Sequence, residues 1–345
     1  MLDPAIALLL QPLAAATGPC LWVADENSLS ALPHLAPFAQ KLSLLSNRWD
    51  IVDAARTLGI HSYFSDAHWP EDTVFEQCFF RIAKEKPLVH HIINQAHQHL
   101  APNGTLWLAG FKNEGTKTYS DKAAKLFGHT QKAQKHGEVY LCALPQNPKP
   151  AGELLDTQDY PALRPVYLLD DQPVYSKPGV YGWDKIDAGS QMLVHELRHQ
   201  LPLDKTIASC LDLGCGYGFL SLALADYTIT RRVATDNNLT ALLAMEQNSE
   251  TWGLDLEAIP SNCADTINEQ FELIICNPPF HKGFDTQNDL TELFLRSAKT
   301  HLAPKGAAWF VVNDFIPIEQ KAKRLFKHGQ LLGHNRQFKV LKCWQ

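Results

Sequence analysis

Two short segments of this chain place ligand-binding residue types directly after apolar runs. The first is Leu211–Leu220, Leu-Asp-Leu-Gly-Cys-Gly-Tyr-Gly-Phe-Leu, in which three glycines are spaced two residues apart. Glycines allow a sharp backbone turn and a close approach of a ligand to the main chain. Asp236 follows about 20 residues later, the spacing of an acid that binds ribose hydroxyls at the tip of the next strand. The pattern predicts a nucleotide-type cofactor loop; a plain strand-to-helix connection is the alternative.

The second segment follows Phe271–Cys276 and reads Asn277-Pro278-Pro279-Phe280-His281. Two consecutive prolines cannot continue a strand ladder, and they hold the chain extended. The segment is therefore expected beyond the carboxyl end of a buried strand, which is where ligands bind in open α/β sheets. A rigid loop without chemistry is the alternative, and the glycine-rich loop upstream favours a site.

Alternating strands and helices are expected to position both segments. Strands are predicted at 208–213, 232–235, 256–259 and 271–276, and helices at 191–200, 219–227 and 290–302, with another helix beginning after Asp236. Ser190 precedes the helix at 191–200 and is a residue type favoured as a helix N-cap. Strands that alternate with helices predict a mainly parallel α/β sheet.

The second half of the chain repeats the first. Residues 302–311, Leu-Ala-Pro-Lys-Gly-Ala-Ala-Trp-Phe-Val, resemble residues 100–109, Leu-Ala-Pro-Asn-Gly-Thr-Leu-Trp-Leu-Ala. A duplication of whole domains is the simplest account. The first copy has Phe80-Arg81-Ile82-Ala83 where the asparagine–proline segment is expected, and no glycine-rich loop near 18–26. We therefore predict a degenerate first copy, kept for substrate recognition or stability.

Prolines punctuate a polar stretch between the two copies, at 145, 148, 150, 161 and 165. Such a stretch is typical of a semi-rigid linker between domains. We expect a degenerate domain at 1–150, a linker at 151–165 and a catalytic domain at 166–345.

Both chemical segments resemble those of S-adenosylmethionine-dependent methyltransferases that act on exocyclic amines. Asp212-x-Gly214-x-Gly216-x-Gly218 is similar to their cofactor loop, and Asn277-Pro278-Pro279-Phe280 to their catalytic motif. The Phe-His ending, together with Pro178-Gly179-Val180-Tyr181 and Asp187-x-Gly189-Ser190, resembles the small-subunit ribosomal RNA guanine-N2 methyltransferases. The resemblance implies an α/β fold with two tandem Rossmann-like class I methyltransferase domains, the N-terminal copy degenerate, and a late antiparallel strand near 338–341.

The resemblance also implies roles for individual residues. S-adenosyl-L-methionine is the implied cofactor, and the target is N2 of guanine 1207 in 16S ribosomal RNA of the assembled 30S particle. Asn277, Pro278, Pro279 and Phe280 are the expected catalytic residues, and Phe280, His281 and Ser190 are expected to contact the substrate. The expected cofactor contacts are Asp212, Gly214, Cys215, Gly216, Gly218, Asp236, Asn237, Asn262, Cys263 and Asn277.

These residue types suit methylation of an aromatic amine. The lone pair of guanine N2 is delocalised into the ring, so the amine is a poor nucleophile. The side-chain oxygen of Asn277 and the backbone carbonyl of Pro278 can both accept hydrogen bonds from it. Phe280 would stack on the base, a contact worth roughly 1–3 kcal/mol, and the base must leave its stack to enter the site.

Other functions remain open from the sequence. DNA or RNA adenine-N6 methylation and protein glutamine-N5 methylation use the same chemistry, often with tyrosine at the position of Phe280. A nicotinamide oxidoreductase would need a glycine where Phe219 stands. A non-catalytic RNA-binding protein is a further alternative, because one copy is degenerate.

Composition limits the partners and the compartment. The net charge of −6 excludes a globally basic nucleic-acid coat, so RNA contacts must come from local patches. The eight cysteines form no C-x-x-C pair and predict buried free thiols in a reducing compartment. The apolar N-terminus has no basic region before it, and no segment is long enough to span a membrane. We expect a cytoplasmic monomer with neither a metal nor a membrane partner.

Overall fold

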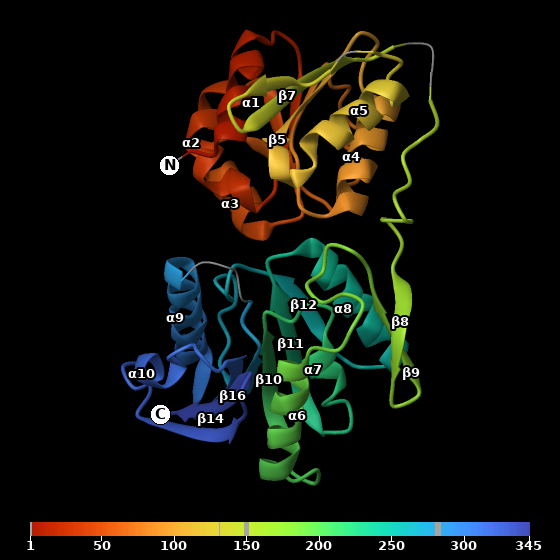
Figure 1. The fold of residues 1–345 in the computed structure, drawn as a ribbon. Helices are drawn as coiled ribbons and strands as arrows, with labels where there is room; N and C mark the ends of the chain where they lie inside the picture. The colour runs from red at the N-terminus through yellow and green to blue at the C-terminus, as the bar shows by residue number, and fades with distance from the viewer. Residues whose placement is uncertain (1, 131, 148–151, 280–283) are drawn as a thin grey trace. The chain divides into compact units, whose positions relative to one another are not determined.

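The chain folds into two compact units, Met1–Ala162 and Leu163–Gln345 (Figure 1). The computed structural model describes residues 2–130, 132–147, 152–279 and 284–345. The division between the units falls inside the range 151–165 that the prolines mark as a linker.

The first unit contains a seven-stranded sheet with the order β3-β2-β1-β4-β5-β7-β6. The five strands from β3 to β5 are parallel, and β7 runs antiparallel to both β5 and β6. The strands are β1 (Cys20–Val23), β2 (Leu42–Ser46), β3 (His61–Phe64), β4 (Gln77–Arg81), β5 (Thr105–Phe111), β6 (Gln134–His136) and β7 (Val139–Pro145). The helices are α1 (Pro4–Ala15), α2 (Leu32–Leu35), α3 (Trp49–Thr57), α4 (Lys86–His99) and α5 (Thr116–Leu126), with short 3₁₀ turns η1 (Glu26–Ala31), η2 (Ala36–Phe38) and η3 (Lys112–Glu114).

The second unit opens with a hairpin and continues as a second seven-stranded sheet, of order β12-β11-β10-β13-β14-β16-β15. The hairpin strands are β8 (Arg164–Leu169) and β9 (Gln172–Ser176). The sheet strands are β10 (Ile207–Leu213), β11 (Ile229–Asp236), β12 (Glu257–Pro260), β13 (Phe271–Cys276), β14 (Leu302–Asn313), β15 (His328–His334) and β16 (Phe338–Trp344). The helices are α6 (Ala188–Gln200), α7 (Phe219–Leu222), α8 (Leu239–Trp252), α9 (Phe284–His301) and α10 (Ile318–Ala322).

The two sheets have the same strand order and the same directions, as expected from a duplicated domain. In the second sheet β16 runs antiparallel to β14, where the late antiparallel strand was expected. Three helices differ from their predicted bounds, and the helix predicted at 290–302 is α9, which begins six residues earlier and ends at His301. The predicted helix 219–227 ends at Leu222. The helix predicted at 191–200 begins at Ala188 because Asp187 is its N-cap, so the alternative of Ser190 as the cap is wrong.

The core lies on both faces of the second sheet, which explains why its strands read as continuous apolar runs. Along β14, Ala308 and Phe310 pack into one cluster with Phe294 of α9. Trp309 and Val311, the alternate residues, pack into a cluster on the opposite face that contains residues of α6. Burial on both faces holds the sheet rigid, so the strand ends are firm supports for side chains.

Candidate functional site

Three of the predicted site residues, Asp212, Asp236 and Asn277, lie at the carboxyl edge of the second sheet. In the register of β10 and β11, Leu213 pairs with Thr235, and Asp236 is the next residue. In the register of β10 and β13, Asp212 pairs with Ile275, two residues before Asn277. Strand β10 is central: the chain passes from it to β11, which lies on one side of β10, and later to β13, which lies on the other side. This is the switch point at which open α/β sheets bind ligands.

The glycine-rich loop leaves β10 in a conformation that needs its glycines. Gly214, Gly216 and Gly218 have φ of +81°, +55° and +94°. A Cβ added to Gly218 would lie 2.1 Å from the sulfur of Met245 on α8, whereas a Cβ on Gly216 would meet nothing within 4 Å. Gly218 therefore allows the close packing of loop and helix, and Gly216 faces open space where a ligand can approach the main chain.

Asp236 fastens this loop to the end of β11. Its Oδ2 accepts a hydrogen bond from Gly216 N at 3.0 Å, and its Oδ1 accepts one from Asn238 N at 2.9 Å. Asn238 in turn donates from Nδ2 to Gly179 O at 2.8 Å, which ties the loop before α6 to the same edge. The carboxylate thus has a fixed orientation beside the glycine loop.

Asp212 is a buried carboxylate with one unpartnered oxygen. It is 1% exposed. Its Oδ2 accepts a hydrogen bond from Ser221 Oγ at 2.7 Å, while no described group pairs with Oδ1. Burial raises the pKa of Asp212 from 3.8 to about 7, and the nearby charge of Asp236 adds to the rise. A buried oxygen without a donor is costly, so this position suits a ligand that carries a cationic amine.

Asn277 follows β13 and is held by two groups at the start of α6. Its Nδ2 donates to Asp187 Oδ2 and to Ser190 Oγ, both at 2.8 Å. Ser190 is buried, at 6% exposed, and its side chain faces Asn277. The predicted contact of Ser190 with the substrate stays a prediction, because no described contact tests it.

The remaining predicted cofactor residues lie at the same edge or close to it. Cys215 is buried in the glycine loop, and Asn237 is half-buried after β11. Asn262 and Cys263 follow β12, where Asn262 N donates to Asp265 Oδ1 at 2.9 Å and Cys263 O accepts from Ser297 Oγ at 2.6 Å. All four lie in segments that directly follow strands β10, β11 and β12, and their contact with a cofactor stays a prediction.

The end of the asparagine–proline motif is only partly described. Pro278 is buried and Pro279 is half-buried. Phe280 and His281, predicted to contact the substrate, lie outside the described residues.

The first unit has other residues at the corresponding register positions. The sequence repeat equates Trp107 of the first unit with Trp309 of the second. Trp107 pairs with Phe79 on the neighbouring strand, and Trp309 pairs with Ile275. On the adjacent central strands, Phe79 pairs with Trp22 of β1, and Ile275 pairs with Asp212 of β10. An indole that stacks on Phe79 at 5.9 Å therefore replaces the buried carboxylate.

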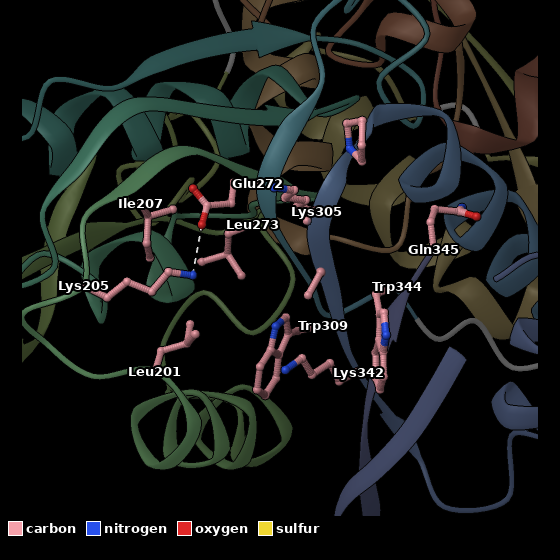
Figure 2. Close-up of a pocket in the computed structure, with 13 residues that line it drawn as sticks. Leu201, Lys205, Ile207, Glu272, Leu273, Lys305, Trp309, Lys342, Trp344 and Gln345 are labelled. Atoms are coloured by element: carbon pink, nitrogen blue, oxygen red, sulfur yellow. Dashed lines mark ion pairs between the residues drawn. The ribbon is translucent and has the colours of Figure 1, made fainter. Parts of the chain in front are cut away.

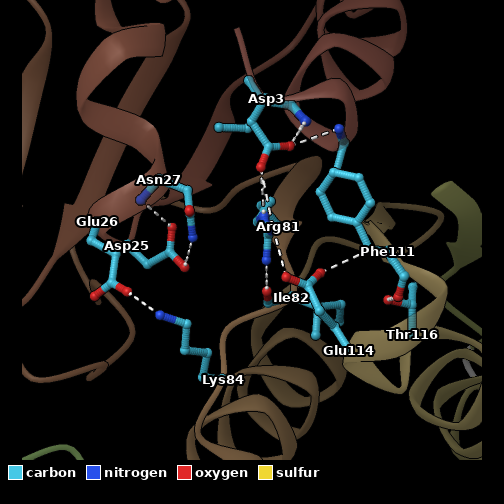
Figure 3. A network of polar contacts seen from close by, with 12 residues as sticks. Asp3, Asp25, Glu26, Asn27, Arg81, Ile82, Lys84, Phe111, Glu114 and Thr116 are labelled. Atoms are coloured by element: carbon cyan, nitrogen blue, oxygen red, sulfur yellow. Dashed lines mark hydrogen bonds and ion pairs between the residues drawn. The ribbon is translucent and has the colours of Figure 1, made fainter. Parts of the chain in front are cut away.

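The same register equates Ser46 with Asp236 and Arg81 with Asn277. The sequence offset had placed Phe80 opposite Asn277, so the structure shifts that correspondence by one residue. Arg81 is 4% exposed and forms ion pairs with Asp3 Oδ2 at 3.1 Å and Glu114 Oε1 at 2.8 Å (Figure 3). A guanidinium held by two carboxylates thus occupies the position of the asparagine, in agreement with the predicted loss of chemistry.

A cavity of about 410 Å³ lies elsewhere in the second unit, at the edge where β10 and β13 begin (Figure 2). Lys205 Nζ pairs there with Glu272 Oε1 at 2.9 Å. Lys342 Nζ lies 5.1 Å from the ring of Trp309 and 5.5 Å from that of Trp344. Because parallel strands begin at this edge, the cavity is separate from the site at their carboxyl ends.

Other features of the described residues bear on the sequence expectations. All eight cysteines are free thiols, and seven of them are buried. Among the described residues, no group of three or more His, Cys, Asp or Glu side chains is arranged to hold a metal ion. No described helix is both long and apolar enough to cross a membrane.

Sequence reasoning gave no role to three residues that shape the site, although it named Asp187 in the motif Asp187-x-Gly189-Ser190. Asp187 and Asn238 are helix N-caps that also bind across the site, and Ser221 holds Asp212. An aspartate three residues before Ser190 and an asparagine directly before an apolar helix are recognisable cap signals. The signals do not reveal that these caps also contact other strand ends.

Comparison with known proteins places this arrangement among methyltransferases. Residues 171–342 match the family model of the methyltransferase small domain. The ribosomal RNA small subunit methyltransferase C of Erwinia tasmaniensis is 33% identical over 178 residues, covering 51% of each chain. That of Klebsiella pneumoniae is 32% identical over 177 residues, covering 51% of this chain and 50% of the relative. The chain spans about half the length of the curated relatives that it matches.

One solved structure is similar over nearly the whole chain. It is the T. thermophilus 16S rRNA N2 G1207 methyltransferase in complex with AdoMet and guanosine, with a TM-score of 0.84 at 23% identity. The likeness covers 99% of this chain and 92% of the other. It confirms the predicted fold of two tandem Rossmann-like domains.

Proposed function

Because the chain belongs, through residues 171–342, to the methyltransferase small domain family, we propose that it is an S-adenosylmethionine-dependent RNA methyltransferase. The reaction is methylation of a guanine N2 in 16S ribosomal RNA, which yields N2-methylguanosine, S-adenosylhomocysteine and a proton. The observation that carries this proposal is the meeting of Asp212, Asp236 and Asn277 at one edge of the second sheet. The names of the two relatives and of the similar structure support the substrate class.

The described residues fit the proposed cofactor. The unpartnered Oδ1 of Asp212 suits the ammonium of a methionine moiety, and the open side of Gly216 admits a ligand close to the main chain. Asp236, fixed by two backbone donors, can accept hydrogen bonds from ribose hydroxyls through its remaining lone pairs. Cys215, Asn237, Asn262 and Cys263 complete the proposed cofactor contacts. The cofactor supplies an electrophilic methyl group on its sulfonium.

The protein's part in the reaction is to orient the amine. Asn277 Oδ1 and the carbonyl of Pro278 accept the two amine hydrogens, which turns the nitrogen lone pair toward the methyl group. Pro278 has no backbone N–H, so this wall presents only an acceptor to the amine. Phe280 stacks on the base, and His281 and Ser190 complete the proposed substrate contacts. Positioning of this kind supplies much of the rate in a transfer between two bound groups.

The reaction product is the direct test of this proposal. Wild-type protein with cofactor and unmethylated small ribosomal subunits should yield N2-methylguanosine, detected by mass spectrometry of the digested RNA. Naked 16S RNA in a parallel reaction distinguishes free RNA from the assembled 30S particle, which is the proposed substrate. N6-methyladenosine in the digest, or methylated glutamine in a protein, would replace the substrate class and leave the methyl transfer intact. No transfer to any of them would overturn the proposal.

The proposed function assigns a role to each part of the chain. The domain at 1–150 is a degenerate copy for substrate recognition or stability, residues 151–165 are a linker, and 166–345 form the catalytic domain. The enzyme acts as a monomer in the cytoplasm, where small subunits are available. Sedimentation equilibrium should give the mass of one chain, and a concentration-independent mass of two chains would contradict the monomer.

We expect only the second unit to bind the cofactor. Trp22, Ser46 and Arg81 stand at the register positions of Asp212, Asp236 and Asn277, so the first unit has neither a carboxylate nor an amide side chain at these three positions. Tritium-labelled cofactor, crosslinked by ultraviolet light and followed by proteolysis, should label peptides beyond residue 162 alone. Label confined to peptides before residue 145 would contradict the assignment of a degenerate first copy.

A further inference from the structure

Asp187 makes two contacts with a single carboxylate oxygen at the start of α6. Its Oδ2 accepts from Ser190 N at 2.8 Å, which caps the helix, and from Asn277 Nδ2 at 2.8 Å. Only the first of these contacts is needed to begin a helix. The second joins the cap to a residue that lies 90 positions away in the sequence.

Space beside this oxygen is limited. A Cβ on Gly189 would lie 3.0 Å from Asp187 Oδ2 and 3.0 Å from a ring carbon of Phe338 on β16. A side chain at residue 189 would therefore crowd both the carboxylate and the sheet. This accounts physically for the motif Asp-x-Gly-Ser, in which the aspartate and serine bind and the glycine leaves room for them.

The contacts of Asp187 decide which end of the Asn277 amide faces the target. An asparagine side chain can present either an oxygen acceptor or an NH₂ donor, and a rotation by half a turn exchanges them. An ionised carboxylate only accepts hydrogen bonds, so the group opposite Asp187 must be the NH₂. Ser190 Oγ takes the second hydrogen of the same nitrogen. With both hydrogens donated, the amide offers Oδ1 to other groups.

We propose that Asp187 is a positioning residue that locks Asn277 with its oxygen toward the target, so that the site accepts an amine and rejects a carbonyl group. In the opposite orientation the NH₂ of Asn277 would face the hydrogens of the target amine, and no hydrogen bond could form. Ser190 supports the lock, and the carboxylate sets its direction. The selectivity part of this proposal rests on the proposed function as an amine methyltransferase.

Substitutions at residue 187 can separate capping from positioning. Asn and Ser are as good at an N-cap as Asp, so Asp187→Asn and Asp187→Ser should both keep α6. The serine side chain is too short to reach Asn277. The asparagine side chain retains an acceptor but also permits the reversed arrangement. Asp187→Ala loses the cap as well, so its difference in thermal stability from Asp187→Ser reports the contribution of capping.

The expected order of turnover differs from the expected order of stability. At saturating cofactor, kcat should fall about 100-fold in Asp187→Ser, because misplacement by about 1 Å has an effect of that size, and should fall less in Asp187→Asn. Melting temperatures of these two variants should stay close to that of the wild type, and Asp187→Ala should melt several degrees lower. KM for the cofactor should change less than kcat, because Asn277 is one of ten expected cofactor contacts. Turnover that follows the melting temperature, with Asp187→Ser as active as wild type, would overturn the proposal.

A measurement without turnover keeps this inference separate from the proposed function. The Asn277 side-chain amide can be assigned in a ¹⁵N correlation spectrum as the NH₂ pair lost in Asn277→Ala. Its hydrogens should exchange slowly with water in the wild type and rapidly in Asp187→Ser. Slow exchange in a wild type that methylates nothing would refute the function and support the lock. Equal exchange in both proteins would refute the lock even in an active enzyme.

Discussion

Replacing Asn277 by alanine should reduce kcat for methyl transfer about 100- to 1,000-fold at saturating cofactor and RNA. The substitution removes the acceptor that orients the target amine, and the loss of one positioned hydrogen-bonding group in an active site has an effect of this order. Asp187 Oδ2 also loses one of its two donors, and Ser190 Oγ loses the hydrogen bond from Asn277. The rate is measured as tritium transferred from labelled cofactor to small ribosomal subunits.

Two further variants give this prediction a control and a contrast. Asn268 is exposed in a loop of the same unit, so Asn268→Ala should keep the wild-type rate. Asn277→Asp places a carboxylate opposite that of Asp187, where the wild type has a hydrogen bond of 2.8 Å. Two like charges at that distance repel, so this variant should be as inactive as Asn277→Ala. Wild-type turnover in Asn277→Ala would remove the residue from the mechanism.

Cofactor binding should weaken as the pH falls below 7, and Asp212 should be the cause. Burial raises the pKa of this carboxyl to about 7 in the free protein. A cationic ammonium binds the ionised carboxylate, whereas below pH 7 the free protein takes up a proton at this carboxyl. Each pH unit below 7 should therefore lower the affinity for the cofactor by up to about tenfold. Titration calorimetry between pH 5.5 and 7.5 measures this affinity. A free α-amine deprotonates at about pH 7.7–8.0, so the ammonium of the ligand stays largely charged across this range.

Asp212→Asn should remove this pH dependence. The amide oxygen can still accept from Ser221, so the local structure should remain, but the charge–charge contact is lost. A hydrogen bond to a charged group contributes about 1.5–3 kcal/mol, which corresponds to an affinity roughly 10–100-fold weaker at pH 7.5. Asp255→Asn, on an exposed carboxylate of the same unit, is the matched control. An unchanged pH slope in Asp212→Asn would assign the titration to another group.

The same carboxyl affects the stability of the free protein with a defined sign. Its folded pKa lies above the unfolded value of 3.8. The stability that it contributes is therefore fully present below pH 3.8 and is lost as the pH rises through about 7. Asp212→Asn should consequently gain melting temperature relative to wild type between pH 5 and pH 8. A constant difference across this range would contradict the raised pKa.

Several site features could be predicted from the sequence because they depend on local residue types. Gly218 needs a positive φ, and the two prolines after Asn277 cannot pair in a strand; both constraints act within a few residues. The duplicated segments at 100–109 and 302–311 revealed two copies of one fold. The lengths of α6 and α7 were less accurate, because a cap residue at 187 and packing after Leu222 decide where those helices begin and end.

The sequence by itself determined the residue types of the glycine-rich loop and the asparagine–proline motif, which resemble those of methyltransferases, and its repeat predicted the two-domain plan. Only the tertiary structure decided how Asp187, Ser190 and Asn277 meet, and that Arg81 rather than Phe80 corresponds to Asn277. The unpartnered Oδ1 of Asp212 likewise emerged from the folded chain. The physical reason is distance along the chain: backbone preferences act between near neighbours, whereas strand register and helix docking bring together groups 90 residues apart.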